Sequence, residues 1–136
     1  MSFHIRDILT SVVSNGFRFD GSGFVILSAS QTGWKPAVSS QVSMKFKTYA
    51  PNGLLFFAGK DRDFISIELR NGRVVYQYDL GGGRVELEYL FKEVNDGEWH
   101  DVQVNRRNTS GMLFVDEDGG TIVDLLLNLH YIPYIF

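Results

Sequence analysis

The chain has no cysteine and only three prolines among its 136 residues. Without thiols it can hold neither a disulfide framework nor a cysteine nucleophile nor a zinc finger. No apolar run approaches the roughly 20 residues of a membrane-spanning helix, and the opening residues MSFHIR do not resemble a signal peptide. We therefore expect no membrane insertion, and we expect any secreted form to be part of a longer chain.

An excess of charge of either sign is also lacking. The chain carries 13 basic and 16 acidic residues, interspersed, for a formal net charge of −3. This balance argues against general nucleic-acid binding, so any anion site must come from a local patch. What the chain does have is 44% hydrophobic and 14% aromatic residues. That content, at this length, predicts one domain with a real core.

Catalytic motifs are missing as well. The three histidines lie in separate segments, with no nucleophile motif near them: His4, His100 and His130. We expect His100 to be a structural neighbour of a buried Trp99. Glu86 and Glu88 share one strand face and are typical of a solvated surface. No helix with Lys-Ser/Thr follows the glycines at 81–83, which excludes a phosphate loop. We therefore expect no enzymatic activity.

Most of the chain alternates between apolar and polar residues, as half-buried strands do. The alternation is clear in residues 42–46, 85–89 and 102–104. Residues 54–58 are wholly apolar, which predicts a strand buried on both faces or one near the centre of the sandwich. Further strands are predicted at residues 112–115 and 122–127. Short strands between turn signals predict an all-β antiparallel sandwich.

The N-terminal part departs from this period. Apolar residues between Ile5 and Val13 recur at helical spacing, yet many are β-branched, so a short helix and an extended lead-in both remain open. Residues 17–19 and 24–27 predict two strands around a tight turn at 20–23. Residues 28–40 predict an exposed loop that carries Trp34.

A β-hairpin can be paired from the sequence around Asn71-Gly72, a strong signal for a turn with two left-handed residues. Counting outward from the turn gives these opposite pairs: Leu69 with Val74, Ile67 with Tyr76, Ile65 with Tyr78, and Asp63 with Leu80. The first three pairs are apolar and share one face. Asp63 is a carboxylate that continues this core-facing register. Since its pair with Leu80 is a non-hydrogen-bonded one, the hairpin leaves the Leu80 carbonyl unused.

Several ordered motifs resemble the laminin G-like domain, in particular that of laminin α chains; the same module occurs in neurexin, agrin and perlecan. They are FDGSGFVIL, VSMKFKTYAPNGLLFFAG, DFISIELRNGRVVYQYDLGGG and NDGEWHDVQVNR. The resemblance covers roughly residues 17–123 and implies a jelly-roll sandwich of two antiparallel sheets. We divide the chain into a lead-in, residues 1–14, and a laminin G-like domain, residues 15–136, which lacks the family's last strands.

The resemblance also implies a Ca²⁺ ion at the sandwich rim. It places a carboxylate ligand at Asp63 and a carbonyl ligand at Leu80, both oxygen donors of the kind calcium prefers. Further candidates lie near the C-terminus: the side chains of Asp124 and Asn128 and the carbonyl of Leu126. On the residues alone, Asp63 could equally end a strand in the charged loop at 60–63, paired with Arg62 or Lys60.

Basic residues and a sequon suggest other sites. Arg106 and Arg107 are predicted in a loop, and Arg70 and Arg73 stand opposite across the hairpin, where a sulfated glycan would relieve their repulsion. Scattered solubilising charges are the alternative. Asn108-Thr109-Ser110 is an N-glycosylation sequon, which is compatible with secretion.

These observations favour a secreted, calcium-dependent adhesion module of the extracellular matrix. A laminin-type resemblance implies partners such as glycosylated dystroglycan, an integrin or heparan sulfate. A metal-free structural domain that completes another chain's sheet is one alternative. A lectin-like domain that binds neutral sugars on Trp34 and Tyr49 is another.

The C-terminal end generates a first prediction. The family's last strands are missing, and the segments 125–127 and 131–136 are very apolar, so we expect an unpaired sheet edge. Sedimentation should therefore show self-association that grows with concentration. A clean monomer at high concentration would contradict the unpaired edge.

Overall fold

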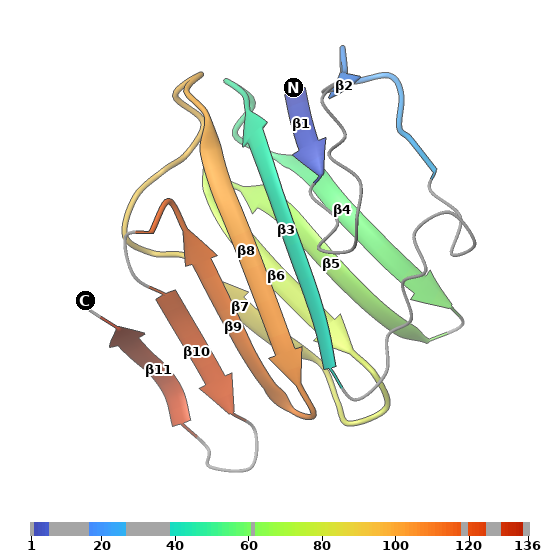
Figure 1. Ribbon diagram of the computed structural model, residues 1–136, viewed down its shortest axis with the longest axis vertical. Coiled ribbons are helices and arrows are strands. Elements are labelled where there is room, and N and C mark those ends of the chain that lie inside the picture. Colours follow the sequence, from blue (N-terminus) through green and yellow to red (C-terminus); the bar gives the residue numbers. More distant parts are fainter. Residues whose placement is uncertain are drawn as a thin grey trace.

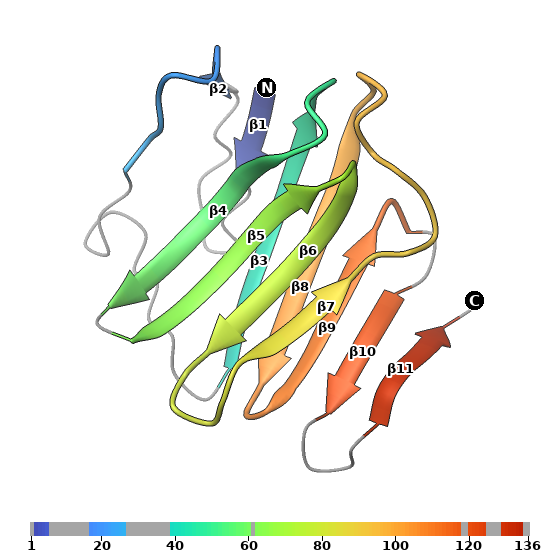
Figure 2. The ribbon, with the colours of Figure 1, turned by 180° about the vertical axis from the view of Figure 1, so that it is seen from behind.

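Two antiparallel β-sheets face each other in the computed structural model of the chain (Figures 1 and 2). The structure describes residues 2–5, 17–26, 39–60, 62–117, 120–124 and 129–134, and the side chains of 17–26, 39–59 and 62–117. Every regular element in these ranges is a strand. Within them, no helix is long and apolar enough to cross a membrane. The predicted all-β sandwich is confirmed.

One sheet has four strands in sequential order. They are β4 (Gly53–Lys60), β5 (Asp63–Arg70), β6 (Arg73–Asp79) and β7 (Val85–Glu88). The turn between β5 and β6 has φ of 51° at Asn71 and 79° at Gly72, the two left-handed residues that its sequence predicts. The three predicted apolar pairs are confirmed: Leu69 with Val74, Ile67 with Tyr76 and Ile65 with Tyr78.

The other sheet has seven strands in the order β11-β10-β9-β8-β3-β1-β2. They are β1 (Ser2–Ile5), β2 (Phe17–Arg18), β3 (Ser39–Lys47), β8 (His100–Arg107), β9 (Ser110–Val115), β10 (Gly120–Asp124) and β11 (Leu129–Tyr134). Figure 1 shows this sheet in front of the four-stranded one.

The core fills the space between the sheets. Its largest fully buried side chains come from both of them and from the connection after β7: Phe46, Tyr76, Tyr89, Ile65 and Leu87. Burying one such side chain stabilises the fold by about 1.5–3 kcal/mol. Tyr78 crosses the core and donates a hydrogen bond to the carbonyl of Thr109 at 2.9 Å, which ties the end of β6 to the hairpin between β8 and β9.

Residues 54–58 differ from the prediction of a strand buried on both faces. β4 is the outermost strand of its sheet, and Leu54 and Phe57 are each 59% exposed. A register irregularity between Leu54 and Phe56 accompanies this exposure. The apolar run could not show position within the sheet, because that position depends on which strands pair elsewhere in the chain.

The prediction of a buried Trp99 is wrong, and the buried residue of the pair is its neighbour His100. Trp99 is 44% exposed, whereas His100 is only 5% exposed. β8 begins at His100, and its alternation turns His100, Val102 and Val104 toward the core. Trp99, one residue earlier, therefore lies at the surface.

The N-terminal expectations have mixed outcomes. Residues 2–5 are extended and pair with β3, while the proposed helical stretch from residue 6 onward lies outside the described residues, as do Leu27 and Trp34. The turn at 20–23 forms, since Asp20 accepts a hydrogen bond from the Ser22 amide at 2.8 Å. The second predicted strand is wrong over residues 24–26, which are exposed and belong to no sheet.

The C-terminal residues are not simply a tail beside an open edge. Residues 129–134 form β11, which pairs with β10. The outer position in the described part of this sheet therefore passes to β11. Self-association through that edge stays a prediction.

Gly111 provides a test of the tie between the sheets. A Cβ at this position would lie 2.7 Å from both Cε1 and Oη of the Tyr78 side chain, which is buried and hydrogen-bonded. Gly111→Ala should therefore lower the free energy of unfolding by about 1–3 kcal/mol. Gly82→Ala is the matched control, because its nearest neighbour would be an ordinary contact at 3.7 Å. Equal losses for the two variants in urea unfolding would contradict this packing.

Candidate functional site

Three connections between strands lie at one end of the sandwich, the lower end in Figures 1 and 2. They are the β4–β5 hairpin, the β6–β7 loop and the β8–β9 hairpin. We call this end the Asp63 rim and define it by residues 62–63, 79–84 and 107–110. The opposite end, which we call the His100 rim, holds residues 48–52, 71–72, 95–100 and 116. The predicted calcium ligands Asp63 and Leu80, together with Arg107 and Asn108, belong to the Asp63 rim, whereas Tyr49, Arg70 and Arg73 lie toward the His100 rim.

Asp63 and Leu80 both lie at this rim, each one residue beyond the last observed pair of the β5–β6 hairpin. The last pair between β5 and β6 is Phe64 with Asp79, and the next step of the register sets Asp63 opposite Leu80. The Asp63 side chain is exposed, and no hydrogen bond or ion pair joins its carboxylate to another described residue. The Leu80 side chain packs against the core.

The β6–β7 loop turns sharply directly after Leu80. Gly81 and Gly83 have φ of 86° and 101°, values at which other residues are strained. The Gly81 amide donates to Oδ1 of Asp79 at 3.1 Å. The loop can therefore leave the sheet at once, with the Leu80 carbonyl at the point of departure. A carboxylate and a carbonyl at neighbouring strand ends match the hard oxygen donors of a Ca²⁺ shell.

The remaining predicted ligands are only partly placed. Leu126 and Asn128 lie outside the described residues. Asp124 ends β10, in register with Ser110 of the rim, so its backbone lies at the same end of the molecule. Across the described ranges, no three His, Asp or Glu side chains are grouped as a metal site would need. The described chain thus offers two oxygen ligands, and further ones would have to come from residues 124–128 and water.

Arg106 and Arg107 lie in strand β8 and not in the predicted loop. Strand alternation sends them to opposite faces. Arg106 is 5% exposed; its Nη1 donates to the Asn108 carbonyl at 2.8 Å, and its Nε donates to Oγ of Ser40 at 3.3 Å. Arg107 is exposed. The structure therefore does not bring the two arginines together in one surface patch.

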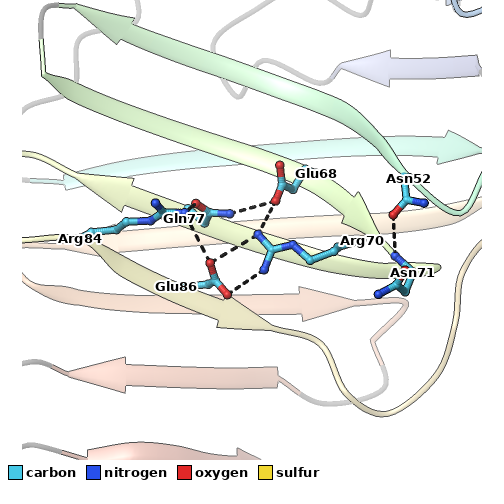
Figure 3. Close-up of polar contacts among 7 residues, drawn as sticks. All are labelled: Asn52, Glu68, Arg70, Asn71, Gln77, Arg84 and Glu86. Atoms are coloured by element: carbon cyan, nitrogen blue, oxygen red, sulfur yellow. Dashed lines mark hydrogen bonds and ion pairs between the residues drawn. The ribbon is translucent and has the colours of Figure 1, made fainter.

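Arg70 and Arg73 are directly opposite, as predicted, but each has a partner within the protein. Arg70 forms ion pairs with Glu68 at 2.6 Å and Glu86 at 2.9 Å (Figure 3). The hydrogen bonds that Arg70 donates to Glu86 and Glu68 raise the pKa of its guanidinium. Arg73 donates to the carbonyl of Leu90 at 2.7 Å. Their mutual repulsion therefore needs no sulfated ligand to relieve it.

The sequon lies at the Asp63 rim. Asn108 and Thr109 form the two-residue turn of the β8–β9 hairpin, since Arg107 pairs with Ser110. Asn108 is exposed and left-handed, with φ of 53°.

Two exposed aromatic residues, Tyr49 and Trp99, lie at the His100 rim. Tyr49 is 80% exposed, and a Cβ on Gly97 would meet its ring at 2.3 Å. Trp99 follows Gly97 by two residues, and Nζ of Lys47 lies 5.4 Å from the centroid of its ring. Trp34, the other predicted sugar platform, lies outside the described residues. Sequence reasoning missed Trp99; counting the β8 alternation back from Val104 and Val102 would have found it.

The tightest cluster of titratable groups surrounds His100 and is structural in character. Nδ1 of His100 lies 2.6 Å from Oδ2 of Asp116, and Nε2 lies 2.9 Å from Oδ1 of Asp96. Asp116 also accepts from the Asp101 amide at 2.7 Å and pairs with Lys92 at 3.0 Å. Both ring nitrogens are thus occupied, which leaves none for a substrate or metal.

The same contacts set the protonation of this cluster. Burial disfavours the charged imidazole, but hydrogen bonds with Asp116 and Asp96 outweigh burial and raise the pKa of His100. Burial also acts against ionised Asp116, yet its hydrogen bonds with His100, the Asp101 amide and Lys92 lower the pKa of this carboxyl. The pKa of Asp96 is lowered first by the Glu98 amide and then by His100.

These shifts predict how stability depends on pH. A raised histidine pKa stabilises the fold fully below the unfolded pKa of about 6.5 and loses that effect as pH rises through the folded pKa. The lowered carboxyl pKa values act above about pH 3.9, and their effect fades as pH falls. The free energy of unfolding from urea titrations should therefore decrease as pH rises above about 6.5, and this slope should vanish in His100→Gln. A slope that survives the substitution would assign it to other groups.

Comparison with known proteins identifies a family with sequences similar to this chain. The family described as "Laminin G domain" matches residues 46–128. The chain is 39% identical over 114 residues to "Laminin subunit alpha" of Drosophila melanogaster, which covers 82% of this chain and 3% of that protein. It is 39% identical over 93 residues to "Neurexin 1" of the same organism, covering 65% of this chain and 5% of that protein.

Solved structures of laminin domains resemble the fold of this chain. "Mouse laminin alpha1 chain, domains LG4-5" superposes with a TM-score of 0.63 at 25% identity, over 67% of this chain and 24% of that one. The chain spans only 3% and 5% of the length of these two curated relatives. The family match, with the relatives and the shared fold, shows that the chain belongs to the laminin G domain family.

Proposed function

We propose that this chain is an extracellular binding module that attaches to cell-surface receptors or matrix glycans through a Ca²⁺ ion held at the Asp63 rim, and that it catalyses no reaction. One observation carries the proposal. The observed register of β5 and β6 ends with Phe64 opposite Asp79, and its next step would set the exposed carboxylate of Asp63 opposite the strand-end carbonyl of Leu80. Nothing else in the described chain engages that carboxylate.

The donor set supports calcium above other cations. A carboxylate and a main-chain carbonyl are hard oxygen ligands, and Ca²⁺ accepts six to eight of them in a flexible shell that water can complete. Zinc and copper favour nitrogen or sulfur ligands; the chain has no cysteine, and both nitrogens of His100 are engaged elsewhere. Asp63, Leu80 and residues 124–128 would hold the ion at the end of the sandwich.

A rim-bound ion also suggests the class of ligand. Water molecules that complete a calcium shell can be exchanged for anionic oxygens, such as the carboxylates or sulfates of a glycan. Heparan sulfate and the glycan of dystroglycan are ligands of this class. Exposed Arg107 lies at the same rim and would add attraction, whereas buried Arg106 would hold the hairpin in shape.

The relatives support the extracellular setting. Proteins named laminin, neurexin and "Basement membrane proteoglycan" contain the similar segments, and their names belong to the matrix and the cell surface. The sequon at Asn108 fits passage through the secretory pathway. We therefore place the chain outside the cell, in or near a basement membrane.

Calcium titration tests the proposal directly. Isothermal calorimetry on the whole chain should detect Ca²⁺ binding, and Asp63→Asn should weaken it about tenfold or more, because one charged ligand becomes neutral. Saturating Ca²⁺ should also raise the melting temperature. At a free Ca²⁺ concentration of 100 times Kd, binding adds about 2.7 kcal/mol to the free energy of unfolding.

Asp20→Asn is the matched control. Asp20 is another exposed aspartate, outside the Asp63 rim, and asparagine can keep its turn. Its calcium affinity should equal that of the wild type. A folded chain that shows neither binding heat nor a thermal shift with Ca²⁺ would eliminate the metal site.

A further inference from the structure

We propose that Asn108 carries an N-linked glycan and that this glycan slows the approach of large ligands to the Asp63 rim while leaving the rim open to ions. The screening part rests on the proposed function, since it concerns access to the same rim. The modification itself rests on the position of the sequon in the fold.

The acceptor side chain is placed for modification. Asn108 is the first residue of a two-residue hairpin turn and is exposed. Its carbonyl is engaged by Arg106 at 2.8 Å, but no hydrogen bond joins its side-chain amide to another described residue. The left-handed φ of 53° is one that asparagine tolerates better than most residues. The side-chain amide is therefore exposed on a fixed backbone and makes no hydrogen bond to the part of the chain that the structure describes.

The covalent step needs a glycosyl donor from the secretory pathway, an oligosaccharide linked to a lipid pyrophosphate. Nδ2 of Asn108 forms a bond to the anomeric carbon of the first sugar, while the bond from that carbon to the pyrophosphate oxygen breaks. The amide loses one proton, and the lipid pyrophosphate leaves. No oxidant or reductant is required.

The hairpin tip is fixed beside the glycine loop that follows Leu80. Tyr78, two residues before Leu80, donates to the Thr109 carbonyl at 2.9 Å. A Cβ on Gly82 would lie 3.7 Å from Cγ2 of Thr109. Figures 1 and 2 both show the β8–β9 hairpin and the β6–β7 loop adjacent at this end. Thr109, the residue after Asn108, thus lies against the loop that follows Leu80. A bulky glycan on Asn108 would therefore begin beside the candidate calcium ligands.

The absence of cysteine makes a clean reporter possible. Gly82→Cys places a single thiol beside Thr109, at a glycine where a side chain makes only an ordinary contact. Tyr49→Cys places one at the His100 rim, where the native side chain is 80% exposed. Each variant is secreted from mammalian cells and then compared with and without Ser110→Ala. That change removes the sequon but keeps left-handed Asn108, whereas Ser110→Thr keeps the sequon and serves as its control.

Peptide mass spectrometry should first find the glycan on Asn108 in the sequon-bearing proteins and not in Ser110→Ala. A polyethylene-glycol maleimide should then label Cys at position 82 roughly fivefold more slowly when the glycan is present, while N-ethylmaleimide reacts at similar rates in both. Labelling at position 49 should not depend on the glycan. Enzymatic removal of the glycan from the folded protein should restore the fast rate without any substitution.

Two results would overturn the proposal: an unmodified Asn108 in the secreted protein, or equal labelling rates at position 82 with and without glycan. The reporter requires neither Ca²⁺ nor a receptor, so its result remains decisive even where calcium calorimetry eliminates the metal site. Where calcium does bind, its affinity should be the same in the glycosylated protein and in Ser110→Ala.

Discussion

The turn at Asn71-Gly72 is the constraint on which much of the structure depends. Its two left-handed residues fix the register of β5 and β6. The same turn also anchors its neighbours, because the Gly72 amide donates to the Pro51 carbonyl and the Gly72 carbonyl accepts from the Val94 amide, each at 2.7 Å. Asn52 adds a side-chain bond to the Asn71 amide at 2.9 Å (Figure 3). One turn therefore holds the connections on both sides of the hairpin.

The consequence of that register reaches the opposite end of the sandwich. Because side chains alternate along a strand, a slip of one residue would exchange every inward and outward position of the hairpin. Ser66 and Gln77 would then enter the core in place of Ile65 and Tyr78, at a cost that excludes the slipped state. The correct register also carries Asp63 to the position opposite Leu80. The candidate site is thus a by-product of the pairing that builds the core.

Sequence alone was sufficient where local chemistry decides the structure. The Asn-Gly turn, the pairs of β5 and β6 and the alternation of β3 all followed from short-range rules. Prediction from sequence failed where the position of a strand depends on partners that are distant along the chain. The apolar run of β4 is an outer strand because no described strand pairs on its other side. The candidate calcium site shows the same division, since the placement of Asp63 and Leu80 follows from one local hairpin, whereas Leu126 and Asn128 lie outside the described residues.

Strand β8 carries a different buried polar side chain at each of its ends, and the two rims differ accordingly. Its inward positions run from His100 through two valines to Arg106, so each end of the core receives a cation or potential cation. His100 is neutralised by two carboxylates, Asp96 and Asp116. Arg106 instead donates to a hydroxyl and a carbonyl, Oγ of Ser40 and the backbone of Asn108. Carboxylates at the His100 rim are therefore committed to the fold, whereas the Asp63 carboxylate has no hydrogen bond or ion pair among the described residues. The pH-sensitive cluster and the proposed metal site thus fall at opposite ends of the sandwich.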